Sequence, residues 1–139
     1  MSQNNIRTAL DTRLLSVPGG ITSALTAWDN KGLKTAPAIT QPYQITSLLP
    51  ATPDTPGLSE QTTIHAGIYQ VLLMMPVNAG PLAGESAAQL IVNHFYAGLP
   101  LTYGGQTVRI RGTPAIAGGY VSGERYAVPV SIRYYSIVS

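Results

Sequence analysis

The stretch from Thr62 to Met75 constrains the fold more than any other part of the sequence. In its first half, Thr62, Ile64, Ala66 and Ile68 fall on one side by alternation, whereas from Tyr69 onward nearly every residue is apolar. Alternation indicates a strand with one wet face, and an apolar run indicates a strand covered on both faces. The sequence therefore predicts a long strand over 62–75 whose second half lies at the centre of a sheet.

Two other segments repeat their apolar residues at helical spacing. Ile6, Leu10 and Leu14 follow this period until a Pro-Gly-Gly sequence stops it, which predicts an N-terminal helix. A second helix is expected to open at Glu85 or the glycine before it and to run to Leu99. Further strands are expected at 21–28, 43–49, 106–116 and 128–135, and loops at 29–32, 50–57, 77–84 and 119–123.

This order of elements predicts an α+β fold and excludes a parallel βαβ winding. We expect a mixed or antiparallel sheet of about five strands with two helices packed on one face. The length of 139 residues is close to the commonest size of a single domain. We therefore expect one domain over residues 1–139.

The sequence carries unusually little charge. Only 10% of its residues are charged, against about 25% in a typical globular protein. A free monomer depends on surface charge for solubility, whereas a subunit covered by its neighbours needs less, so this composition favours an assembly. The N-terminus lacks the pattern of a secretory signal, and the apolar run from Val71 to Val77 is too short for a membrane helix. A cytoplasmic product without a membrane partner is expected.

The residues that most often carry chemistry are few and scattered. The chain has no cysteine, two histidines (His65 and His94) and six acids that stand apart from one another in the sequence. Metal sites need three or four convergent ligands, so a structural or solvent-facing role is favoured for both histidines. The glycine-rich turn from Gly80 to Ser86 lacks the lysine and the spacing of a phosphate loop. Nothing in these residues favours a catalytic, cofactor or metal site.

Three arginines form the clearest polar pattern. Alternation places Arg109 and Arg111 on the same face of one strand, and Arg133 occupies a polar-face position on the last strand. One interpretation is a basic patch that contacts DNA. The favoured interpretation is a solvated face, or one that forms ion pairs between subunits. All three are therefore candidate inter-subunit or partner contacts.

Taken together, the pieces resemble the tail terminator, or tail completion, proteins of long-tailed phages, the group with folds like the lambda minor tail protein U. The resemblance covers almost the whole chain. It rests on "IRTALDTRL" (Ile6 to Leu14), "AWDN" (Ala27 to Asn30), "PYQITSLLPATP" (Pro42 to Pro53), "GIYQVLLMMP" (Gly67 to Pro76), the turn and helix that end in Phe95, and "VPVSIRYY" (Val128 to Tyr135).

The resemblance implies a structural virion protein, not an enzyme and without catalytic residues or a cofactor. It is made in the host cytoplasm and forms a ring at the head-proximal end of the tail tube. Its implied partners are copies of itself in a hexamer, the tail tube protein and the head–tail connector protein, with room for DNA to pass through the ring. We expect the proline-rich loop from Pro50 to Gly57, with the adjoining strand start from Leu58 to Ala66, to reach a neighbouring subunit or ring. The candidate contact residues in these two segments are Pro53, Asp54, Thr55, Pro56 and Leu58.

Two alternative functions stay open at this point. One is another neck or head-closure component, which shares small size and ring formation. The other is a small ligand-binding or enzymatic α+β domain, because a fold does not fix a function and a pocket leaves no mark on a sequence.

Overall fold

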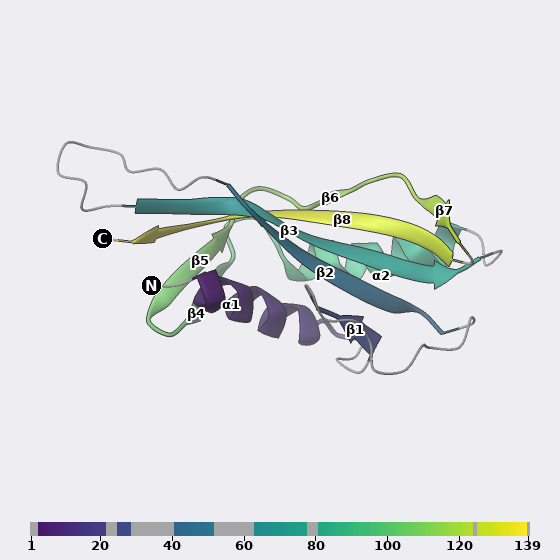
Figure 1. The fold of residues 1–139 in the computed structure, drawn as a ribbon, viewed down its shortest axis with the longest axis horizontal. Coiled ribbons are helices and arrows are strands. Elements are labelled where there is room, and N and C mark those ends of the chain that lie inside the picture. Colours follow the sequence, from purple (N-terminus) through teal and green to yellow (C-terminus); the bar gives the residue numbers. More distant parts are fainter. Residues whose placement is uncertain are drawn as a thin grey trace.

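A computed structural model describes residues 3–21, 25–28, 41–51, 63–77, 81–123 and 125–138 (Figure 1). Two helices and eight strands follow one another along the chain. They are α1 (Gln3–Leu15), β1 (Thr26–Ala27), β2 (Tyr43–Pro50), β3 (Thr63–Pro76), α2 (Pro81–His94), β4 (Pro100–Tyr103), β5 (Gln106–Ile110), β6 (Ala115–Ile116), β7 (Tyr120–Ser122) and β8 (Arg125–Val138).

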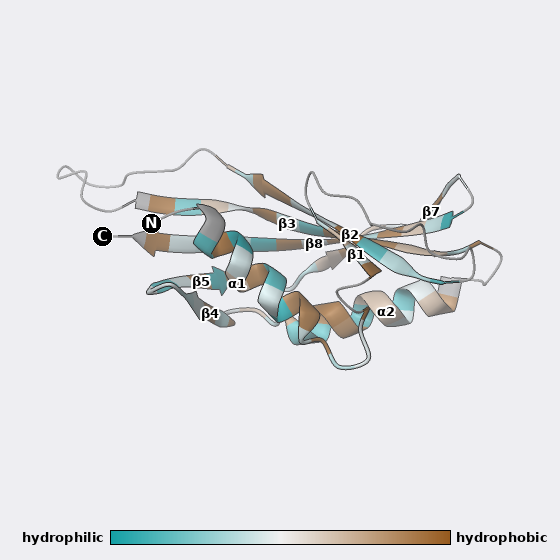
Figure 2. Cartoon of the chain, turned by 60° about the horizontal axis from the view of Figure 1, so that its bottom comes forward, coloured by the Kyte–Doolittle hydropathy of each residue, from teal (hydrophilic) through white to brown (hydrophobic). Residues whose placement is uncertain are grey.

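All eight strands belong to one sheet, with β3 at its centre. The strand order is β1-β2-β3-β8-β5-β4, and β6 and β7 also pair with β8. β1 runs parallel to β2, and every other described pair is antiparallel. Both helices lie on the same face of this sheet (Figures 1 and 2). The expected α+β fold, with a mixed sheet and two helices on one face, is confirmed.

The number of strands was underestimated, because β8 is longer than expected. It runs for 14 residues and pairs along its whole length with β3. Its other edge has backbone groups that also need partners. The short strands β5, β6 and β7 pair with successive parts of that edge. The strand predicted at 106–116 is therefore two strands, β5 and β6. The loop predicted at 119–123 contains the strand β7. β4 was not predicted and extends the sheet beyond β5.

Several element boundaries also differ from expectation. α1, β2 and β3 closely match their predicted ranges, and β1 lies within the strand predicted at 21–28, of which residues 22–24 are outside the described ranges. α2 begins earlier than predicted, at Pro81, because proline suits the first turn of a helix. It also ends earlier, at His94, and Gly98 then takes a positive φ of 83° as the chain turns into β4. The predicted loop at 29–32 lies outside the described residues.

The core lies between the helices and the sheet. Alternation on β8 directs Val128, Val130, Ile132 and Tyr134 toward the helices, as the sequence indicates, whereas on β3 the side with Ile64, Ala66 and Ile68 faces away from the helices and Tyr69, Val71 and Leu73 face them. The second half of β3 is buried on both faces, since Leu73 and Met74 are both nearly inaccessible. The fully buried large side chains include Ile6, Leu10 and Leu14 of α1, Tyr69, Val71 and Leu73 of β3, Val108 and Ile110 of β5, Ile132 and Tyr134 of β8, and Phe95.

One polar contact in this core fixes α1 to the central strand. The Tyr69 side chain is 0% exposed, and its hydroxyl donates a hydrogen bond of 2.5 Å to the carboxylate of Asp11. Burial, and then the charge of Asp11, raise the pKa of Tyr69 well above its ordinary value of 10.0. The hydroxyl is therefore protonated at neutral pH and remains a donor. The Tyr69 ring also packs near Phe95, with 6.5 Å between the ring centroids.

Tyr69→Phe removes only this hydroxyl, and we expect it to lower the free energy of unfolding by about 1–3 kcal/mol. The reason is that the Asp11 carboxylate loses a donor at a site where water enters poorly. Urea unfolding measures the loss. Tyr103→Phe is the matched control, since Tyr103 is 48% exposed and its change should stay within about 0.5 kcal/mol. Equal effects of the two substitutions would contradict this role of the Tyr69 hydroxyl.

Candidate functional site

The face of the sheet opposite the helices, called the outer face here, presents its own row of side chains. Because Tyr69 points toward the helices, its neighbour Ile68 points away from them. In the strand register, Ile68 lies opposite Leu49 of β2 on one side and opposite Arg133 of β8 on the other. These three side chains therefore form a row across three adjacent strands on the outer face.

The three predicted arginines come together at the end of this row. Arg109 is exposed on β5 opposite Tyr135, and the backbone N–H of Arg111 donates to the Arg133 carbonyl at 2.8 Å. The Arg111 guanidinium carbon lies 5.5 Å from the centre of the Tyr135 ring, a cation–π contact. All three arginines are exposed. In the described part of the chain, no carboxylate forms an ion pair with any of them.

Large aliphatic side chains adjoin the arginines. Leu49 is 52% exposed, Ile68 is 37% exposed and Ile137 at the end of β8 is 56% exposed. Together with the three arginines they make up what we call the arginine–aliphatic patch. Interface centres are enriched in arginine, aromatic and apolar residues and depleted in lysine and acids. The patch has this composition, so it suits contact with another protein surface.

The proline-rich loop leaves the sheet beside the patch. Its candidate contacts Pro53, Asp54, Thr55, Pro56 and Leu58 lie outside the described residues, but both ends of the loop are placed. At its start, the N–H of Ala51 donates to the Ala66 carbonyl at 2.8 Å, one residue beyond β2. At its end, Thr63 pairs with Val138. The loop therefore begins and ends on the strands that carry Leu49 and Ile68.

A second exposed surface lies on α2, which is on the helix side of the sheet. Leu82 is 72% exposed and Leu90 is 39% exposed. Glu85 stands one turn after Leu82 and is also exposed. Glu85 also lines a groove of about 350 Å³ between α2 and the segment from Ile116 to Gly119. This surface combines apolar residues with a negative charge.

His94 has a structural role, as favoured from the sequence. Arg13 donates two hydrogen bonds to the His94 carbonyl, from Nε at 3.1 Å and from Nη2 at 2.8 Å. Ser16 Oγ lies 2.7 Å from the Arg13 carbonyl and 2.7 Å from His94 Nε2. The Ser16 hydroxyl has one hydrogen, which it donates to the Arg13 carbonyl. His94 Nε2 therefore carries a proton and donates a hydrogen bond to Ser16 Oγ. These bonds join the C-terminal ends of α1 and α2.

Burial, and then the positive charge of Arg13, lower the pKa of His94 from its ordinary value of 6.5. Below about pH 6.5, His94 therefore takes up a proton more readily in the unfolded chain than in the folded chain. The free energy of unfolding should fall as the pH drops below this value, until His94 is protonated in the folded state as well.

His94→Gln should reduce this loss of stability, because glutamine keeps a donor for Ser16 but does not titrate. The measurement is urea unfolding at several pH values between about 7.5 and 5. His65→Gln, on β3, is the matched control for the loss of a histidine. An unchanged pH dependence in His94→Gln would contradict the assignment.

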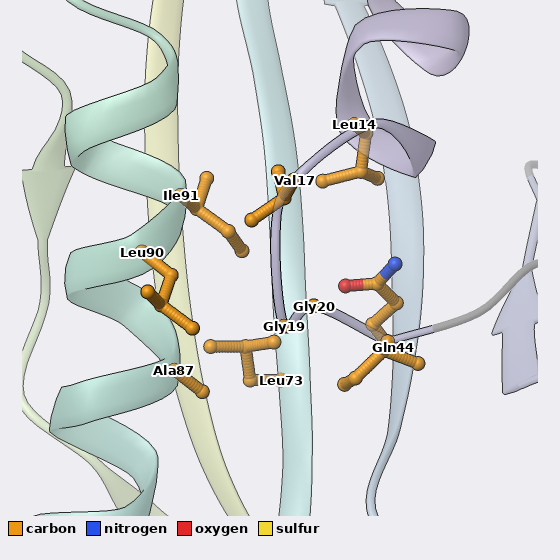
Figure 3. Close-up of a pocket in the computed structure, with 10 residues that line it drawn as sticks. Leu14, Val17, Gly19, Gly20, Gln44, Leu73, Ala87, Leu90 and Ile91 are labelled. Carbon is orange, nitrogen blue, oxygen red and sulfur yellow. The ribbon is translucent and has the colours of Figure 1, made fainter.

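One cavity between the helices and the sheet is small. Leu14, Val17, Leu73, Leu90 and Ile91 surround a cavity of about 30 Å³, with Gln44 at one side (Figure 3). Sites for small molecules usually measure about 300–1,000 Å³, so this cavity is too small to bind a ligand. Within the described residues, no three His, Asp or Glu side chains gather in a way that could hold a metal ion. None of the described helices is long and apolar enough to cross a membrane.

The sequence indicated part of these surfaces and missed the rest. The three arginines were identified, and the structure brings them together on the outer face. Leu49 and Ile68 were interpreted only as strand residues, although alternation from Tyr69 places Ile68 on the outer face. Leu82 fell in a predicted loop, because the expected start of α2 was too late, so its pairing with Glu85 on one helix face could not be seen.

Comparison with known proteins gives matches over the whole fold. The family model described as phage tail terminator protein matches residues 5–134. One solved protein structure aligns with 98% of this chain and 96% of its own, with a TM-score of 0.74 and 26% sequence identity. No curated protein matches the sequence.

Proposed function

Because the chain belongs to the phage tail terminator family, we propose that it forms a ring at the head-proximal end of the tail tube. There it ends polymerisation of the tube and joins the tail to the head–tail connector. Family membership itself implies a structural role in the tail of the virion, and the proposal adds the ring, its position and its two partners. We propose a ring of six subunits, like the one that the lambda U-like resemblance implies.

One structural observation supports ring formation most directly. The chain exposes two unlike surfaces on opposite sides of its sheet: the arginine–aliphatic patch on the outer face, and Leu82 with Glu85 on α2. Two unlike surfaces allow head-to-tail contact between copies, and such contacts close into a ring when the rotation per subunit permits. The low content of charged residues, 10%, is consistent with a subunit that is covered by neighbours.

The proposal predicts how the purified protein behaves with tail tubes. Light scattering should find a closed oligomer, and electron microscopy should find it at one end of isolated tubes and absent from filled heads. Particles that lack the gene should make tails of abnormal length. Subunits that stay solitary across a wide concentration range, together with tails of normal length, would contradict the proposal. Binding to filled heads alone would instead support a head-closure component.

The proline-rich loop is proposed to contact a neighbouring subunit or ring through Pro53, Asp54, Thr55, Pro56 and Leu58. Deleting Thr52 to Pro56 should block the joining of tails to heads while leaving a folded subunit, as judged by circular dichroism. A variant with the same five positions replaced by glycine and serine separates loop length from side-chain contact. The measurement is the yield of infectious particles, and an unchanged yield after the deletion would contradict the proposal.

A further inference from the structure

Among the described residues, each of the two exposed surfaces carries charge of a single sign. The arginine–aliphatic patch carries three positive charges and, in the described residues, no carboxylate paired with them. Like charges held together raise one another's electrostatic energy, and an opposite charge on a partner relieves it. Asp11, on α1, already accepts a hydrogen bond from Tyr69. Within the described ranges, Glu85 is the one exposed carboxylate.

The apolar residues of the two surfaces also match in arrangement. On the outer face, Ile68 lies directly opposite Arg133 in the register, so an exposed aliphatic side chain adjoins a positive charge. On α2, Leu82 stands three residues before Glu85, and residues at this spacing are neighbours on a helix surface. Each surface therefore sets an aliphatic group beside a charge, and the two charges have opposite signs.

We propose that the arginine–aliphatic patch of one copy binds α2 of the next copy, with Arg133 facing Glu85 and Ile68 packed against Leu82. This inference rests on the proposed ring and assigns its subunit contact. A two-fold contact of patch against patch would place arginines against arginines, which is unfavourable. Contact between unlike surfaces avoids this repulsion and leaves one free patch and one free α2 surface, at the two ends of the growing chain, until the ring closes.

Charge reversal tests the contact. Arg133→Glu and Glu85→Arg each bring like charges together, so each should weaken assembly at least about tenfold, measured by light scattering over a concentration series. Both positions are exposed, and circular dichroism checks that each variant folds. Arg133→Lys is the matched control: it keeps the charge and should keep the ring. The double variant, with both reversals in one chain, should assemble again.

Mixing the two single variants gives a sharper result. In a ring where the two variants alternate, the Glu introduced at position 133 of one variant meets the Arg introduced at position 85 of the other. At the next contact, the native Arg133 of the second variant meets the native Glu85 of the first. An equimolar mixture should therefore form rings that contain both chains in equal amounts, although neither chain forms them alone. Mass measurement of the mixed ring, with one chain carrying a tag, reads the stoichiometry.

The outcomes separate this inference from the proposed function. If the wild-type protein forms no ring, the proposed function fails. If the wild-type protein forms rings and both single variants do so equally well, the inference is overturned while the ring stands. It is also overturned if Glu85→Arg assembles normally while Arg133→Glu does not, because the partner surface is then not α2. Normal rings of Arg133→Glu that no longer retain a short DNA duplex would assign the arginines to nucleic acid instead.

Discussion

Backbone pairing between β3 and β8 is the interaction on which the rest of the structure depends. The two 14-residue strands pair from Thr63 and Val138 at one end to Pro76 and Arg125 at the other. β2 adds to the free edge of β3, and β5, β6 and β7 share the free edge of β8. This long pair fixes which side chains face the helices and which face outward, because alternation on two such strands leaves no freedom of register.

The placement of both helices on one face has a direct consequence for function. The helix side buries the aliphatic and aromatic core, and Tyr69 and Asp11 fix α1 to that side. Neither described helix covers the outer face, which carries exposed aliphatic residues beside three arginines. A structural tail protein with unlike surfaces on its two sides has what a repeated contact between copies requires.

Much of the fold was predictable from the sequence, since it rests on strong periodic patterns. The alternation and apolar run of 62–75 identified β3, and the spacing of Ile6, Leu10 and Leu14 identified α1. The short strands β4 and β7 were not predicted, because β4 forms by pairing with β5 and β7 by pairing with the free edge of β8, and their own residues carry no strong pattern. Alternation in the sequence was enough to place the three arginines on one face. Placing Leu49 and Ile68 beside them required the strand register, and placing Leu82 on α2 required the true start of that helix.

Chemical crosslinking tests the central claim, that unlike surfaces of neighbouring copies meet, most directly. The chain has no cysteine, so Ile68→Cys and Leu82→Cys introduce unique reactive sites for a short, flexible bis-maleimide. The chain that carries both substitutions should give a ladder of crosslinked species up to the full ring, whereas each single substitution should leave monomers. Crosslinked dimers from Ile68→Cys alone, with no ladder from the double variant, would contradict the account.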